Sequence, residues 1–111
     1  MSLTLLLHCH DLDATRGFYR ALPGFSVSDP GDATLTVTQA GATLIFTAAD
    51  LWGGPLAFTG TLYFSVADVD AVFAAIGTGV TVAWPPQDMP YGGREFGIRD
   101  CNGYHLAFRR A

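Results

Sequence analysis

The chain contains no lysine, and all six of its basic residues are arginines. These arginines form no run or stripe of positive charge, and the formal net charge is −4. Neutralisation of phosphates by Lys and Arg dominates the affinity of nucleic-acid binding, so this composition argues against a nucleic-acid partner. A mildly acidic chain suits a neutral or cationic small partner better.

Charged residues are also scarce, at 14% of the 111 positions, and no apolar run is long enough to span a bilayer. Half of the residues are hydrophobic, so the chain can build a real core, and disorder is not expected. The N-terminus lacks the basic-then-apolar pattern of an export signal. We therefore expect a cytoplasmic protein that does not interact with a membrane.

Cysteine is limited to two residues, Cys9 and Cys101. They fall in different halves of the chain, which would allow a disulfide between the halves. In the expected compartment, thiols are kept reduced, so two reduced cysteines are the simpler interpretation. The chain also has no Gly-rich phosphate-binding loop and no spacing that marks a nucleophile.

The main feature of the chain is an internal repeat. Residues 3–19 and residues 60–76 each read as an apolar strand, a short acidic turn and a helix. The carboxylates of Asp11 and Asp13, and those of Asp68 and Asp70, suit the start of a helix, where they cap free N–H groups. A period of half the chain indicates a duplicated supersecondary unit, because a solenoid needs at least about three shorter repeats. The crevice between two such halves is a natural ligand site.

Each half predicts a strand, a helix and three further strands, which is an α+β arrangement. In the first half the predicted strands cover 3–9, 25–28, 33–39 and 42–48, and the helix covers 14–22. In the second half the strands cover 61–66, 80–84, 94–99 and 104–109, and the helix covers 68–76. Turns are predicted over 29–32 and 100–103, and a long loop over 85–93. The organisation is therefore a first module at 1–49, a linker at 50–60 and a second module at 61–111, in one structural domain.

Three segments carry a resemblance to a known family: residues 10–25 (HDLDATRGFYRALPGF), 64–76 (FSVADVDAVFAAI) and 89–108 (MPYGGREFGIRDCNGYHLAF). They resemble the vicinal oxygen chelate superfamily, also called the glyoxalase/bleomycin-resistance/dioxygenase family. The resemblance implies two tandem βαβββ modules whose curled sheets form a cup around a ligand, and it implies a homodimer. It is specific for the fold and unspecific for the reaction, because this scaffold carries many chemistries.

Enzymes of this superfamily usually hold a divalent metal with His, Glu or Gln side chains from four strands. The resemblance maps the four ligand positions onto Thr4, Ile45, Thr61 and Ala107. None of these residues supplies the anionic or imidazole donors that such a metal needs. We therefore expect no metal and no other cofactor, and the chain is most similar to the metal-free, bleomycin-resistance-like branch.

Strand alternation predicts which side chains line the cup. The predicted ligand-binding residues on strands are Thr4, Leu6, His8, Ile45, Thr61, Tyr63, His105 and Ala107. Trp52, Trp84 and Tyr91 are expected at loop-like positions, where their rings could stack on a flat ligand or instead cover the core or a dimer interface. Arg94 is expected to pair with Glu95 or with a ligand carboxylate, or to form a surface charge pair.

The favoured function is metal-free binding and sequestration of a small, drug- or toxin-like molecule with aromatic or cationic character. One alternative is a metal-dependent enzyme of the glyoxalase or dioxygenase type, with a shifted site made of His8, His105 and Glu95. The other alternative is a non-catalytic regulatory member of the family.

Overall fold

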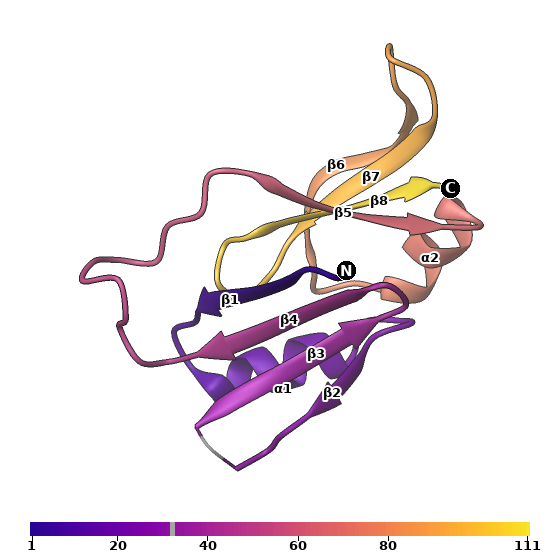
Figure 1. The fold of residues 1–111 in the computed structure, drawn as a ribbon. Helices are drawn as coiled ribbons and strands as arrows, with labels where there is room; N and C mark the ends of the chain where they lie inside the picture. Colours follow the sequence, from indigo (N-terminus) through magenta and orange to yellow (C-terminus); the bar gives the residue numbers. More distant parts are fainter. Residues whose placement is uncertain (32) are drawn as a thin grey trace. The chain divides into compact units, whose positions relative to one another are not determined.

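The computed structural model describes residues 1–31 and 33–111, and the chain divides into two compact units, Met1–Ala57 and Phe58–Ala111 (Figure 1). The first unit contains β1 (Thr4–His8), α1 (Leu12–Arg20), β2 (Ser26–Ser28), β3 (Thr34–Gln39) and β4 (Ala42–Thr47). The second contains β5 (Thr61–Val66), α2 (Val69–Ile76), β6 (Thr81–Asp88), β7 (Arg94–Arg99) and β8 (His105–Arg110). Both units are βαβββ, as predicted. The predicted turn over 29–32 ends on Asp32, which lies outside the described residues.

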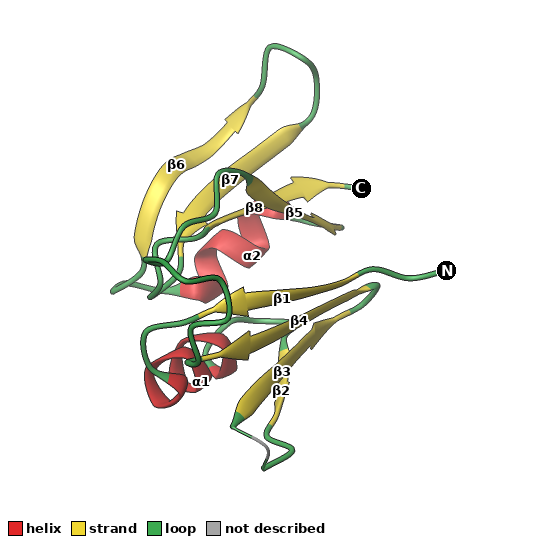
Figure 2. Cartoon of the chain, turned by 60° about the vertical axis from the view of Figure 1, so that its left-hand side comes forward, coloured by secondary structure: helices red, strands yellow, loops and turns green. Residues whose placement is uncertain are grey.

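Each unit forms one four-stranded sheet, in the order β1-β4-β3-β2 and β5-β8-β7-β6. The first and last strands of a unit pair in parallel, and the other neighbours pair antiparallel. A helix lies on one face of its own sheet in each unit (Figure 2). The opposite face of each sheet is therefore not covered by that unit's helix, and we call it the open face.

The acidic turns start the helices, as the sequence predicts. The carboxylate of Asp11 accepts the backbone N–H of Asp13 at 2.9 Å, and the carboxylate of Asp68 accepts that of Ala71 at 3.1 Å. Each bond satisfies a donor that has no partner inside the helix. These aspartates therefore have a structural role.

The cores lie between each sheet and its helix and are rich in aromatic rings. Tyr19 of α1 is fully buried and packs on Phe46 of β4, with ring centroids 5.1 Å apart. Phe73 of α2 meets Phe96 of β7 edge to face at 5.1 Å, and Phe96 stacks on Phe108 of β8 at 5.0 Å. Burial of these large rings supplies much of the packing stabilisation on the helix side.

Strand β6 differs from the prediction, because it continues through Pro85 and Pro86 to Asp88, where a loop was expected over 85–93. Proline is tolerated there because β6 is the edge strand of its sheet in the described part of the chain, next to β7, and its other side needs no N–H donor within that sheet. The pairing of β6 with β7 shifts register between Val82 and Trp84 and again between Trp84 and Gln87. These bulges accommodate the prolines within the strand. The resulting β6–β7 hairpin carries residues of the candidate site.

Candidate functional site

The open face of the second unit is defined by strand register. Phe96 contacts Phe73 of α2, so its neighbours Glu95 and Gly97 point away from the helix. Cross-strand partners share a face. The open face therefore carries Thr61, Tyr63, Ser65, Trp84, Glu95, Gly97, Arg99, His105, Ala107 and Arg109. The expected facing of Thr61, Tyr63, His105 and Ala107 is confirmed, whereas their role toward a ligand stays a prediction.

Glu95, the second residue of β7, lies on this face opposite Arg109 of β8. It is the only glutamate in the chain, and only 2% of its surface is exposed. Its carboxylate accepts hydrogen bonds from the indole Nε1 of Trp84 at 3.1 Å, from the hydroxyl of Tyr91, and through a longer contact of 3.5 Å from the hydroxyl of Tyr63. Burial of a carboxylate is costly unless donors surround it, and here aromatic side chains supply those donors.

Gly97 determines how Trp84 lies on the sheet. A Cβ atom at Gly97 would come within 2.5 Å of the Trp84 indole, so only glycine lets the ring rest against β7. The same ring stacks on His105, with centroids 6.3 Å apart and an interplanar angle of 16°. In this position the indole N–H points at Glu95, so Gly97 positions a donor of the candidate site.

Tyr91 reaches Glu95 from the turn between β6 and β7. The turn is closed by hydrogen bonds of 2.9 Å from the Met89 N–H to the Gly93 carbonyl and from the Gly92 N–H to the Met89 carbonyl. Although 65% of Tyr91 is exposed, its hydroxyl contacts the buried carboxylate. This hydrogen bond raises the pKa of Tyr91 well above its usual value, which keeps the phenol protonated as a donor.

A pocket of about 270 Å³ adjoins the carboxylate. It is lined by Ser65, Tyr91, Gly92, Gly93, Glu95, Arg109, Arg110 and Ala111. The guanidinium carbon of Arg109 lies 5.4 Å from the centroid of the Tyr63 ring, at cation–π distance. Because a water molecule takes up about 30 Å³ in the liquid, the pocket has room for a ligand group of several heavy atoms.

The open face of the first unit carries the predicted residues of that half. Thr4, Leu6 and His8 of β1 stand opposite Thr43, Ile45 and Thr47 of β4 and share their face. Threonines from β3 continue the same face, because Thr34, Thr36 and Thr38 pair with Thr47, Ile45 and Thr43. The expected facing of Thr4, Leu6, His8 and Ile45 is confirmed by this register.

Trp52 is held beside His8 by a turn that Asp50 organises. The Asp50 carboxylate accepts the backbone N–H groups of Trp52, Gly53 and Gly54 at 3.2, 2.7 and 3.3 Å. These bonds, the one from Gly53 first, hold the pKa of Asp50 below its usual value. The Trp52 and His8 rings are 5.8 Å apart in a tilted arrangement. Trp52 is 55% exposed, so its ring face is open to solvent.

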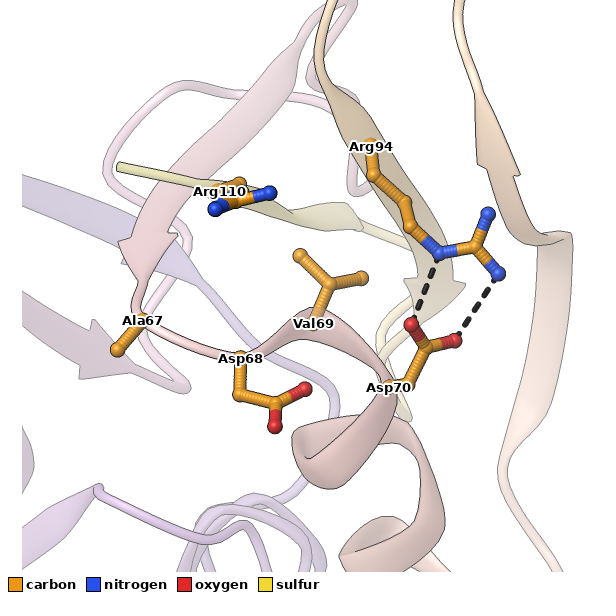
Figure 3. A pocket seen from close by; sticks show the side chains of 6 residues that line it. All are labelled: Ala67, Asp68, Val69, Asp70, Arg94 and Arg110. Carbon is orange, nitrogen blue, oxygen red and sulfur yellow. Dashed lines mark hydrogen bonds and ion pairs between the residues drawn. The ribbon is translucent and has the colours of Figure 1, made fainter.

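Of the pairings considered for Arg94, the one with Glu95 is not formed, and the structure shows a charge pair with two aspartates instead. Adjacent strand residues point to opposite faces, so Arg94 lies on the helix side of β7. There its guanidinium contacts Asp88 at 3.3 Å. It also binds both carboxylate oxygens of Asp70, at 2.9 and 3.0 Å (Figure 3). This fork lowers the pKa of Asp70 and joins α2 to β7.

The pocket in Figure 3, of about 280 Å³, lies beside that ion pair and is lined by Ala67, Asp68, Val69, Asp70, Arg94 and Arg110. Both of its carboxylates already have partners, since Asp68 caps α2 and Asp70 binds Arg94. Arg94 is likewise held by acidic side chains. We therefore assign a structural role to the ion pairs of Arg94 with Asp70 and Asp88.

The alternative metal site is not assembled in the second unit. Glu95 pairs with Arg109, and His105 pairs with Arg99. These two pairs are four positions apart along the β7–β8 ladder, which separates the backbone positions of Glu95 and His105 by about 13 Å along the strands. The Trp84 indole, which contacts both residues, lies between them. His8, the third proposed ligand, belongs to the first unit. Over residues 1–31 and 33–111, no three His, Cys, Asp or Glu side chains form a group that could hold a metal ion.

Two βαβββ units in tandem, each with its helix on one face of a four-stranded sheet, define a class of paired-module proteins. The sequence profile of the Glyoxalase/Bleomycin resistance protein/Dioxygenase superfamily matches residues 3–108, and the chain belongs to this superfamily. A search of curated proteins finds no match. In the described part of the chain, no helix is long and apolar enough to cross a membrane.

Solved structures share this fold at low sequence identity. TioX from Micromonospora sp. ML1 is 21% identical with a TM-score of 0.80, over 99% of this chain and 98% of that one. A superfamily member from Sphaerobacter thermophilus is 20% identical with a TM-score of 0.80, over 100% and 97%. A bleomycin resistance determinant encoded on transposon Tn5 is 20% identical with a TM-score of 0.77, over 99% and 97%. These likenesses establish the fold.

Proposed function

We propose that this protein binds and sequesters a small drug- or toxin-like molecule without a metal ion, as a homodimer in the cytoplasm. The observation that carries the proposal is the open face of the second unit, where a buried carboxylate lies among aromatic rings beside a pocket. Small-molecule sites combine apolar and aromatic walls with a few placed polar groups. Tyr63 and Tyr91 supply exposed rings there, and Glu95 supplies the polar group.

The metal-free part of the proposal rests on the four positions that hold the metal in enzymes of the superfamily. Here they read Thr4, Ile45, Thr61 and Ala107, and their hydroxyl and hydrocarbon side chains do not bind a divalent ion without other donors. Ala107 is fully buried between β5 and β7. Elemental analysis of protein purified without chelator, before and after addition of divalent metals, tests this part. Stoichiometric metal in either sample would contradict it.

Ligand binding is tested by calorimetric titration with a panel of glycopeptide and heteroaromatic antibiotics. At least one compound should bind, and Tyr63→Ala should weaken its binding roughly tenfold or more, as expected for an aromatic contact at the centre of a site. Val82→Ala is the matched control, because Val82 is 43% exposed and pairs with Ile98 on the helix side of the sheet. Failure of every compound to bind, or equal binding by the Tyr63 variant, would argue against the proposed site.

A further inference from the structure

We propose that the ligand carries a positively charged nitrogen group, such as a protonated amine or amidine, and that Glu95 binds this group directly. The inference rests on the proposed function and names the chemical class of its ligand. Its basis is a buried carboxylate that, within residues 1–31 and 33–111, accepts side-chain hydrogen bonds from neutral donors alone.

The ion pairs of the described residues leave Glu95 out. Arg16 pairs with aspartates, and Arg94 does so on the far side of β7. Arg109 stands opposite Glu95 in the β7–β8 ladder, but its guanidinium lies over the Tyr63 ring. Glu95 contacts a phenol, an indole and a more distant second phenol, none of which carries charge. These donors hydrogen-bond the carboxylate of Glu95 and bring no positive charge to it.

A cationic ligand would complete this arrangement. A carboxylate offers about four acceptor positions, and the three donors in the structure leave one of them, on Oε1, unused. A buried carboxylate gains most from a partner that brings both charge and hydrogen bonds, because neutral donors offset only part of its lost hydration. The faces of Tyr63 and Tyr91 also attract a cation. Arg109 already places one over Tyr63.

Positive charge in the adjoining pocket does not reverse this preference. Arg109 and Arg110 line it, but both side chains are exposed, where water and salt screen their fields. Glu95 is 2% exposed, so its field is screened least. A neutral aromatic molecule would contact the rings but leave the charge of the carboxylate uncompensated. An anionic one would approach the buried charge at a cost.

The inference is tested by titrating the protein calorimetrically with benzamidine, benzamide and benzoate, which have nearly the same shape and differ in charge. We expect benzamidine to bind at least tenfold more tightly than benzamide, and benzoate to bind most weakly. Glu95→Gln should weaken benzamidine binding by about tenfold or more, the range for a hydrogen bond to a charged group, and should change benzamide binding little. Asp88→Asn is the control, because it removes one exposed carboxylate on the helix side and should leave all three affinities unchanged.

Equal binding of benzamidine and benzamide to the unmodified protein would overturn the inference, as would a folded Glu95→Gln variant that keeps its benzamidine affinity. If that variant does not fold, as judged by circular dichroism, the ratio of the two affinities on the unmodified protein decides. Binding of uncharged antibiotics without any preference for benzamidine would reject the cationic ligand and leave the proposed function intact. Binding of none of the probes and none of the antibiotics would reject both.

Discussion

The two units share one backbone plan and differ on their open faces. Thr34 of β3 occupies the position in the first sheet that Glu95 of β7 occupies in the second. Thr34 pairs with Thr47 of β4, and Glu95 pairs with Arg109 at the equivalent position of β8. Likewise Thr36 stands where β7 has Gly97. One unit therefore has a threonine-covered sheet, and the other has a buried carboxylate with an indole lying on a glycine. The module's fold does not require any particular chemistry on this face, which is thus available for function.

The helix sides of the two sheets are alike. Phe46 stands between Leu7 and Leu35 in the first unit, and Phe108 stands between Phe64 and Phe96 at the matching position of the second. Both phenylalanines are at most 2% exposed. Packing against a helix restricts this side to large apolar residues, so the repeat persists there.

The largest expected effect tests that likeness. Phe46→Ala and Phe108→Ala should each lower the free energy of unfolding by about 3–5 kcal/mol, because each removes a buried ring and leaves a cavity. Urea unfolding followed by circular dichroism measures both losses. A difference of more than about 2 kcal/mol between them would show that the two cores are not equivalent.

A smaller effect should separate the open faces. Gly97→Ala places a Cβ within 2.5 Å of the Trp84 indole and should cost about 1–3 kcal/mol, since the ring must leave its place beside Glu95. Thr36→Ala, at the matching position of the first unit, should cost less than about 1 kcal/mol. The same urea experiment gives both values. Equal losses of unfolding free energy would mean that the contact between Gly97 and the Trp84 ring does not distinguish the second unit from the first.

The smallest effect is a dependence on pH that both units should share. Hydrogen bonds from the backbone, that of Gly53 first, hold the pKa of Asp50 below its usual value, and Arg94 does the same for the pKa of Asp70. Each carboxylate therefore stabilises the fold above its unfolded pKa, about 3.9, and the contribution is lost as the pH falls through the lower folded pKa.

Melting temperatures measured between about pH 6 and pH 2.5 should reveal this loss as a decrease toward acid. Asp50→Asn and Asp70→Asn should each flatten the decrease slightly. The double variant should flatten it by the sum, because the sites are in separate units and share no partner. Steeper acid sensitivity in either variant would contradict the assigned sign.

Most of the fold follows from local signals in the sequence. The bounds of β5 and β7 match the prediction, because alternating apolar residues end at clear turns. The α1 helix begins at Leu12 and ends at Arg20, two residues before each predicted limit, since Asp11 caps it directly. The continuation of β6 through Pro85 was missed, because a proline pair ordinarily signals a loop and its tolerance depends on the strand lying at a sheet edge.

The candidate site was predicted in part. Alternation placed Tyr63 and His105 on the correct face, whereas Glu95 was considered as a partner of Arg94 and as a ligand of the alternative metal site, not as an acceptor for aromatic donors. Its contacts come from β5, β6 and the β6–β7 turn, so no spacing in the sequence joins them. Two signals were present: Glu95 is the only glutamate in the chain, and its place in β7 turns it away from Arg94. Because successive residues of a strand point to opposite faces, Arg94 and Glu95 of β7 are not expected to pair with each other.

The parallel pairing of first and last strands has a consequence for synthesis on the ribosome. In each unit the first strand pairs with the last strand, so it has no partner until that last strand has been synthesised. Thr4 of β1 pairs with Thr43 of β4, and Thr61 of β5 pairs with His105 of β8. Such distant contacts slow folding, and domains emerge in order from the N-terminus. The strand that closes the first sheet, β4, is translated before any strand of the second unit, whereas β8, which closes the second sheet, is translated last. All residues of the threonine-covered face are therefore synthesised before Glu95 is added to the chain.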